Sequence, residues 1–345
     1  MKRIKIKQGT RAWENAKECR IGSSEVFDIV RYYATDTELQ NCGIDAEKFR
    51  EELPFVSTWA LYHKVLNDGI YKKPLLEPSL AEYGLAMETY GQYVLQEGRE
   101  FRLRKGEVFV SDKLIASLDI SGISEEIDDK EFDYGGGRVP LGQHFVCEQK
   151  TISPYKDHLP LKYIIQAQYQ ITMSKKKFFI LQAMILEDDT PFERGKIVSL
   201  ANNSSKKKFF DYVKNKVKVQ HIYFNHNEAL AQLIKVCLNR FFKDVENRKE
   251  PTPYVQVDNI SNIIISIRQN SFFNPDLVKE LDLSGYIEAK KNYDEADRKK
   301  KEEMQKIIEF AMENNCSKFY SPNQYTGSFA ANGRFLLKEP KENKL

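Results

Sequence analysis

Apolar residues in the first hundred positions recur every three or four residues, which is the period of a helix. In residues 14–33 a serine at position 23 or 24 is available to cap a helix formed by the apolar residues that follow. Residues 57–67 and 79–98 carry the same spacing, and Gly98 offers a natural stop. These segments are predicted helices, and the polar residues 36–52 are predicted as loop or one short helix.

After residue 100 the pattern changes to alternating or continuous apolar runs rich in Val and Ile, which predicts strands. Three strands are predicted, at 107–112, 114–127 and 144–152. The acidic, glycine-containing residues 128–143 predict a long hairpin loop. A helix, a buried strand and another helix are then predicted at 160–174, 175–185 and 227–247. This order predicts an α/β or α+β fold with a central mixed sheet flanked by helices.

Beyond about residue 250 the character of the chain changes. Residues 287–315 predict a highly charged helix with a narrow apolar seam, and residues 318–338 contain the Gly and Asn of a closing hairpin. We therefore expect one domain at 1–250 and a C-terminal extension of a charged helix and a hairpin at 251–345.

Composition narrows the classes of protein. The chain has 345 residues, of which 41% are hydrophobic, and a net charge of +3, which is not that of a protein that coats nucleic acid, although it allows a local basic patch. The five cysteines are scattered without a C-x-x-C pair, which argues against a disulfide scaffold or an iron–sulfur site and favours a reducing, intracellular compartment. The basic N-terminus lacks the apolar segment of a secretory signal, and no apolar run is long enough to span a membrane.

Two predicted strands carry acidic residues where their neighbours indicate burial. Asp119 follows the apolar run 115–118, and Glu148 follows the apolar run 145–147, with Lys150 two residues further on. Residues two apart in a strand point to the same face, so Glu148 and Lys150 share one face. Because buried carboxylates are costly unless they are paired or bind a metal, Asp119 and Glu148 predict a Mg²⁺ site with Lys150 beside it. A purely structural ion pair is the alternative.

Taken in order, the motifs resemble the PD-(D/E)XK nucleases, and more narrowly the YqaJ-like viral recombinases of the phage lambda exonuclease family. The core of the resemblance is "SLD" at 117–119, "EQK" at 148–150 and a helix with "QAQYQ" at 166–170. Four flanking segments are similar to the same family: "W…IGSSEV" at 13–26, "TWALYHK" at 58–64, "YGLAMETY" at 83–90 and "FFKDVENRKEPTP" at 241–253. The resemblance covers about residues 11–253.

This resemblance implies a metal-dependent deoxyribonuclease that uses Mg²⁺, with Mn²⁺ able to substitute. It implies that the metal is held by Asp119, Glu148, the carbonyl of Gln149 and Glu88. Lys150 would position the attacking water, and Gln168 would hold Lys150 or a phosphate. The glycine that the family places directly after the motif Asp is shifted here to Gly122.

The resemblance also implies DNA contacts by Lys17, Arg20, Ser23 and Ser24. At the position of Lys17 the family usually has an arginine that holds a terminal 5′-phosphate. Because lysine offers a point charge and not a bidentate fork, the preference for a 5′-phosphate end stays open.

At the level of the whole protein, the resemblance implies 5′→3′ digestion of double-stranded DNA ends by a ring-shaped homo-oligomer, a trimer. It implies a single-strand annealing protein as partner and a phage or prophage origin, in the cytoplasm of a bacterial cell. Two alternatives stay open. One is an endonuclease of restriction or defence type on the same core, and the other is a catalytically silent module that binds DNA or protein.

Overall fold

The structure, a computed structural model of the whole chain, describes residues 2–71, 78–96, 101–124, 139, 142–152, 160–187, 189–254, 256–269, 284–313, 318–320, 326–329 and 335–338. It forms two compact units, Met1–Phe273 and Asn274–Leu345. Most of the predicted hairpin loop at 128–143 lies outside the described residues.

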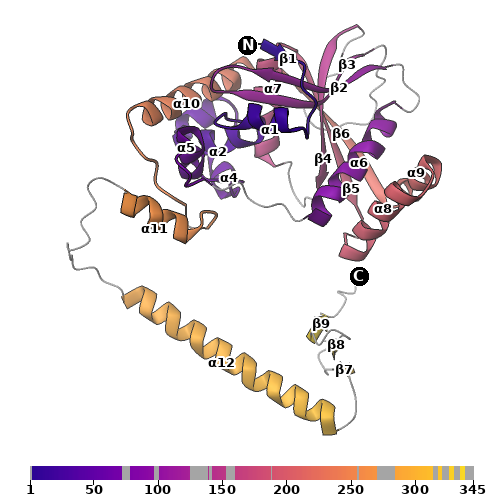
Figure 1. Cartoon of the computed structure of the whole chain (residues 1–345), viewed down its shortest axis with the longest axis vertical. Coiled ribbons are helices and arrows are strands. Elements are labelled where there is room, and N and C mark those ends of the chain that lie inside the picture. The colour runs from indigo at the N-terminus through magenta and orange to yellow at the C-terminus, as the bar shows by residue number, and fades with distance from the viewer. Residues whose placement is uncertain are drawn as a thin grey trace. The chain divides into compact units, whose positions relative to one another are not determined.

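The N-terminal third of the chain is mainly helical (Figure 1). It contains β1 (Lys2–Ile4), α1 (Arg11–Lys17), η1 (Ser23–Glu25), α2 (Val26–Tyr33), α3 (Asp36–Asn41), α4 (Ala46–Glu51), α5 (Thr58–Leu66) and α6 (Pro78–Gln96). Side-chain oxygens of Thr10, Thr35, Asp45 and Ser57 cap the first turns of α1, α3, α4 and α5. The predicted helices are therefore present, and residues 36–51 form two short helices because each has its own cap.

The rest of the first unit supplies most of the sheet and its remaining helices. These elements are β2 (Phe101–Val110), β3 (Ile115–Ser124), β4 (His144–Ile152), α7 (Leu161–Ser174), β5 (Phe178–Leu186), α8 (Pro191–Asn203), α9 (Lys206–Lys214), β6 (Val217–Asn225), α10 (Glu228–Glu246) and α11 (Ile260–Gln269). The six strands lie in sequence order, all antiparallel except for the parallel pair β4–β5, which α7 connects. The predicted central mixed sheet flanked by helices is thus confirmed. The sequence did not predict β1, β6, α8, α9 or α11.

Helices cover both faces of this sheet. On one face α7 packs against β3, β4 and β5, and α2, α5 and α10 pack around α7 in a continuous hydrophobic core. On the other face α6, α8 and α9 form a second core with β5 and β6. Figure 1 shows these two groups of helices on opposite sides of the strands. Strands buried on both faces explain the long apolar runs of β4 and β5.

Residues 251–269 contact the preceding part of the first unit. Ser57 Oγ donates a hydrogen bond of 2.6 Å to Asp258 Oδ1, and Ser266 Oγ donates one of 2.9 Å to Glu250 Oε1. Glu250 also accepts from Trp59, a side chain of α5. The first unit therefore extends to Phe273, whereas the division at 250/251 stays a prediction from composition.

The second unit contains the expected charged helix, α12 (Ser284–Glu313), and a small antiparallel sheet. That sheet consists of β7 (Lys318–Tyr320), β8 (Thr326–Phe329) and β9 (Phe335–Lys338). Ion pairs at i,i+4 spacing, such as Lys290–Asp294 and Asp297–Lys301, lie along α12. No helix in the described part of the chain combines the length and apolar content needed to cross a membrane.

Candidate metal-dependent active site

Asp119 lies at an interruption of the sheet. Strands β2 and β3 pair on both sides of this point, but Gly106 and Asp119, which would face each other, do not pair. Gly106 has a φ of +67°, a conformation that bends the strand and that side-chain-bearing residues rarely adopt. As a result Leu118 packs on the α7 side of the sheet and Ile120 on the α6 side, although strict alternation would place them together. The bend sets the Asp119 carboxylate at a break in the ladder.

The neighbouring strand β4 completes this arrangement. Strands β3 and β4 pair from Ile123–His144 to Ile120–Cys147, so the pairing does not reach Asp119, the neighbour of Ile120. There Asp119 Oδ2 accepts a hydrogen bond of 3.0 Å from the backbone N–H of Gln149. The side chain thus takes the place of a backbone acceptor and ties Asp119 to the strand that carries Glu148.

Glu148 is held by donors from two elements. Its Oε1 accepts hydrogen bonds from Lys150 Nζ at 2.7 Å and Gln166 Nε2 at 2.6 Å, and its Oε2 accepts one from Gln170 Nε2 at 2.9 Å. Glu148 is 5% exposed, whereas the Lys150 side chain is 27% exposed. Glu148 and Lys150 lie on one face of β4, as expected, and the glutamines of α7 hold the Glu148 carboxylate in place.

The surroundings of Asp119 and Lys150 shift the pKa of each of these side chains. Burial raises the pKa of Asp119 well above its ordinary value, and the charges of Glu148 and Glu88 raise it further, against the opposing effects of Lys150 and the Gln149 amide. Burial lowers the pKa of Lys150, but Glu148 and Asp119 more than offset this and leave its pKa raised. Lys150 is therefore a firmly charged ammonium beside two carboxylates.

A cavity of about 720 Å³ opens next to these side chains. Asp119 and Gln149 line it together with Glu88 of α6, an exposed side chain. The opposite wall is the N-terminal segment 3–9 and Trp13, whose Nε1 donates to Ser117 Oγ at 2.9 Å. The carboxylates of Asp119 and Glu88 are thus reached from a cavity between the N-terminal segment and α6.

Behind the cavity, a buried chain of amides continues from the site. The side-chain amides of Gln149 and Gln182 lie 2.7 Å apart, and Gln182 Nε2 lies 2.9 Å from His221 Nε2. A Cβ on Gly91 of α6 would lie 2.5 Å from Gln149 Nε2 and 2.7 Å from Gln182 Oε1. Glycine at position 91 therefore lets α6, and with it Glu88, lie directly against β4 and β5.

The donor set suits a hydrated divalent cation. Among the described residues, no three His, Cys, Asp or Glu side chains converge to form a protein-built cage for a metal. Mg²⁺ does not require one, because it keeps several waters and binds through one or two carboxylates. A buried carboxylate whose pKa is raised by burial and by a neighbouring carboxylate is what such a cation would neutralise. Asp119, Glu148 and the Gln149 carbonyl would hold it, with Glu88 in reach through water.

Of the residues expected to contact DNA, Lys17 contacts a side chain that lines this cavity. Its ammonium sits 4.2 Å from the centre of the Trp13 ring, and Trp13 lines the cavity. Arg20 donates instead to the carbonyl oxygens of Ala16 and Ser111, at 2.9 and 3.0 Å, so its guanidinium fixes α1 to the turn between β2 and β3.

Ser23 and Ser24 lie in the short turn η1. Ser23 is buried and its Oγ has no hydrogen-bond partner among the residues that the structure describes, whereas Ser24 is exposed. Glu25 holds this turn, because it accepts two 2.7 Å bonds from Lys64 Nζ and one from the Gly22 N–H. Two of the flanking motifs found in the sequence are thus joined by a partly buried ion pair.

Gln168 does not belong to the site. Its Nε2 donates to the carbonyl of Asn225 at 2.7 Å and its Oε1 accepts from the Asn227 N–H at 2.8 Å, so it joins α7 to the end of β6. On a helix, residue 168 points about 200° away from residue 166, while residues 166 and 170 share one face. The prediction for Gln168 is corrected to Gln166 and Gln170. Helical periodicity could have linked those two, but not which face meets Glu148.

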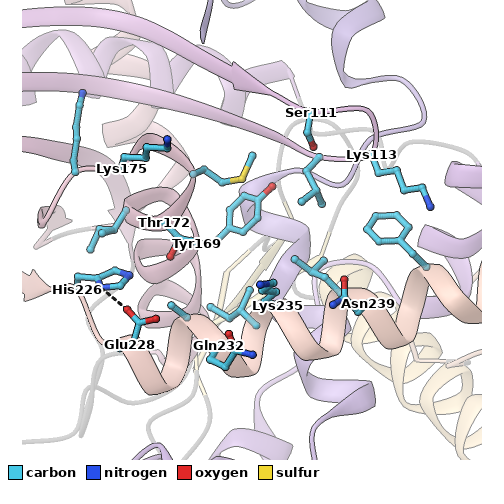
Figure 2. A pocket seen from close by; sticks show the side chains of 18 of the residues that line it. Ser111, Lys113, Tyr169, Thr172, Lys175, His226, Glu228, Gln232, Lys235 and Asn239 are labelled. Atoms are coloured by element: carbon cyan, nitrogen blue, oxygen red, sulfur yellow. Dashed lines mark ion pairs between the residues drawn. The ribbon is translucent and has the colours of Figure 1, made fainter. Parts of the chain in front are cut away.

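A second cavity, of about 790 Å³, lies between α7, α10 and the turn between β2 and β3 (Figure 2). Its floor is apolar and includes Tyr169 and Leu238, and lysines such as Lys175 and Lys235 lie at its rim. The acidic side chains that line it are Asp112 and Glu228, and Glu228 pairs with His226 at 3.5 Å. It lacks the neighbouring carboxylates of the Asp119 cavity, so it is the weaker candidate for hydrolytic chemistry.

Comparison with family models and with curated proteins found no match. Solved structures similar to this chain include an alkaline exonuclease, LHK-Exo, from Laribacter hongkongensis, with 13% identity, 70% of this chain and 95% of that chain covered, and a TM-score of 0.38. A phage related exonuclease from Haemophilus somnus 129PT has 13% identity, 68% and 97% coverage, and a TM-score of 0.39. Because these TM-scores are below 0.5, we derive function from the geometry of this chain's own site.

Proposed function

We propose that the protein is a metal-dependent DNA nuclease that hydrolyses phosphodiester bonds at the Asp119–Glu148–Lys150 site. The observation that carries this proposal is the meeting of two carboxylates and a charged lysine at a break in the sheet, where Asp119 lines an open cavity. A purely structural ion pair between Glu148 and Lys150 would not need a second carboxylate. Asp119 nevertheless supplies one, and burial raises the pKa of Asp119.

The roles of the residues follow from their positions. Bound Mg²⁺ would lower the pKa of a water and neutralise charge on the phosphate. Asp119, Glu148 and the Gln149 carbonyl would hold that ion, and Glu88 would contact it through water. Lys150 would place its ammonium where it orients the attacking water and stabilises developing negative charge. Gln166 and Gln170 keep Glu148 in one orientation by donating to both of its oxygens.

The finer assignment is supported by the motif resemblance in the sequence. On that basis we propose an exonuclease that digests double-stranded ends 5′→3′, uses Mg²⁺ or Mn²⁺, assembles as a homo-oligomeric ring and works with a single-strand annealing protein in a bacterial cytoplasm. A preference for a 5′-phosphate would involve Lys17, whose neighbour Trp13 lines the cavity.

Digestion of end-labelled linear duplex DNA beside closed circular plasmid tests this proposal. We expect loss of the linear DNA in Mg²⁺, none in EDTA, and an intact circle, and the order of label release gives the polarity. Cutting of the circle would favour the endonuclease. Binding of DNA without any cleavage in Mg²⁺ or Mn²⁺ would refute the nuclease assignment and favour a binding module.

A further inference from the structure

The N-terminal segment forms one wall of the Asp119 cavity and is anchored at both ends. Strand β1 pairs with β2 at Lys2–Val110, Arg3–Phe109 and Ile4–Val108. Further on, Gln8 Nε2 donates to the carbonyl oxygen of Leu118 at 3.0 Å, one residue before Asp119. The residues between these anchors therefore have a fixed position beside the carboxylates.

Polar and apolar residues alternate along this wall. Ile4, Ile6 and Gln8 are half-buried, and Lys5 and Lys7 are exposed. Their ammonium groups make no ion pair or hydrogen bond with any residue that the structure describes. Both lysines nevertheless line the cavity.

Two other basic residues near this wall already have an acidic partner. Arg3 pairs with Glu107 at 2.9 Å, and Lys176 pairs with the same carboxylate at 2.7 Å. The cavity thus has an acidic side, formed by Asp119 and Glu88, and a basic side, formed by Lys5 and Lys7. A phosphodiester backbone suits this division, because its charge is attracted to the lysines directly and to the carboxylates only through a cation.

We propose that Lys5 and Lys7 bind the backbone phosphates of a DNA strand that lies in the cavity between the N-terminal segment and α6. This inference deepens the proposed nuclease function and rests on it for the identity of the cavity as the active site. The two lysines position the strand next to Asp119 and make no contact with the reacting metal ligands.

The test is duplex DNA binding by fluorescence anisotropy at several salt concentrations, in an Asp119→Asn background that keeps the DNA uncut. We expect the double variant Lys5→Ala/Lys7→Ala to weaken binding on the order of tenfold and to lower the salt slope by about two, since each lost phosphate contact lowers it by about one. The charge-retaining variant Lys5→Arg/Lys7→Arg should restore both.

A matched control is Lys48→Ala/Lys243→Ala, which removes two exposed lysines of α4 and α10 outside the cavity. Equal effects of the two double variants, or an unchanged salt slope in Lys5→Ala/Lys7→Ala, would overturn the inference. With Asp119 restored, we expect the Lys5→Ala/Lys7→Ala variant to raise KM for duplex DNA with little change in kcat.

The two proposals fail separately. If DNA binding depends on Lys5 and Lys7 but the protein never cleaves DNA, the proposed DNA-binding role of the two lysines stands and the nuclease assignment is refuted. Cleavage by the parent protein with an unchanged KM in Lys5→Ala/Lys7→Ala would refute that DNA-binding role alone.

Discussion

The carboxylates of Asp119 and Glu148 lie close together but have different hydrogen-bond partners. Glu148 accepts three hydrogen bonds from side chains, whereas Asp119 accepts one from a backbone N–H and lines the cavity. Burial and Glu148 raise the pKa of Asp119, so its ionised form lowers the stability of the metal-free protein. The metal-free fold thus disfavours the ionised form of Asp119, which is the form that we expect to bind the metal.

The substitution Asp119→Asn should abolish cleavage and stabilise the metal-free protein. Activity should fall at least about 100-fold, because several kcal/mol of metal-dependent stabilisation are lost. Since the folded-state pKa of Asp119 is raised, the stability that comes from its neutral form is present below the unfolded pKa of about 3.9 and is lost as pH rises through the folded pKa.

Thermal unfolding in EDTA checks the stability part. We expect the melting temperature of the Asp119→Asn variant to exceed that of the parent protein at pH 8, and this difference to shrink as pH falls towards 4. A variant less stable than the parent protein at pH 8 would contradict the view that the ionised Asp119 carboxylate destabilises the metal-free protein.

The glutamines of α7 offer a matched comparison. Gln166→Met and Gln170→Met remove donors to Glu148, so kcat should fall by about 10- to 100-fold. Gln168→Met leaves a backbone N–H and carbonyl without partners, so it should lower stability by about 1–3 kcal/mol while kcat is kept. Cleavage assays and chemical unfolding separate these outcomes, and loss of kcat in Gln168→Met alone would contradict them.

At the level of elements, α6 and α7 approach the site from opposite faces of the sheet. Helix α7 begins where Glu52 accepts hydrogen bonds from the N–H groups of Leu161 and Lys162, which fixes the register of its glutamines. Helix α6 approaches closely because position 91 is glycine. The geometry of the site therefore depends on where two helices are held, as well as on which residues the strands carry.

The substitution Gly91→Ala should displace α6. Its Cβ would overlap Gln149 and Gln182, which should cost about 1–3 kcal/mol of stability. Because Glu88 lies one turn earlier on the same helix, activity should fall about tenfold or more. Gly84→Ala on the same helix is the control, since its Cβ meets nothing within 4 Å and should stabilise the helix by about 1 kcal/mol. Equal effects of both substitutions would refute the close approach.

For the whole molecule, the residues of the site and their supports all lie in the first unit. Residues 251–269 belong to that unit through buried contacts: Asp258 with Ser57, and Ser266 with Glu250 and His63. His63 also bonds Asp68 at 2.7 Å. Removal of this segment would leave the buried hydroxyl of Ser57, the N-cap residue of α5, without the acceptor Asp258.

A chain that ends at residue 273 should therefore keep its fold, whereas a chain that ends at residue 250 should lose about 2 kcal/mol or more of stability. Chemical unfolding of the two truncated proteins measures this difference. Equal stability would place the end of the domain at 250, as the change in composition predicts.

The local sequence determined most elements and the identity of the acidic residues. Periodicity located α5, α6, α7 and α10, and the i,i+2 spacing placed Glu148 and Lys150 on one face. Strand β6 was not predicted, because Lys218, Gln220 and His221 interrupt its apolar run. Its strand conformation is explained by pairing with β5. Local patterns suffice where the period of one element already decides which side chains share a face.

The tertiary structure alone decided how these faces meet. The bend at Gly106 sets Asp119 at the break, remote Glu52 starts α7, and Gly91 lets α6 approach. The sequence selected Gln168 from the "QAQYQ" motif, whereas packing turned Gln166 and Gln170 towards Glu148. The physical reason is that a helix fixes which of its residues share a face, but only packing against the sheet fixes which face is turned to the site.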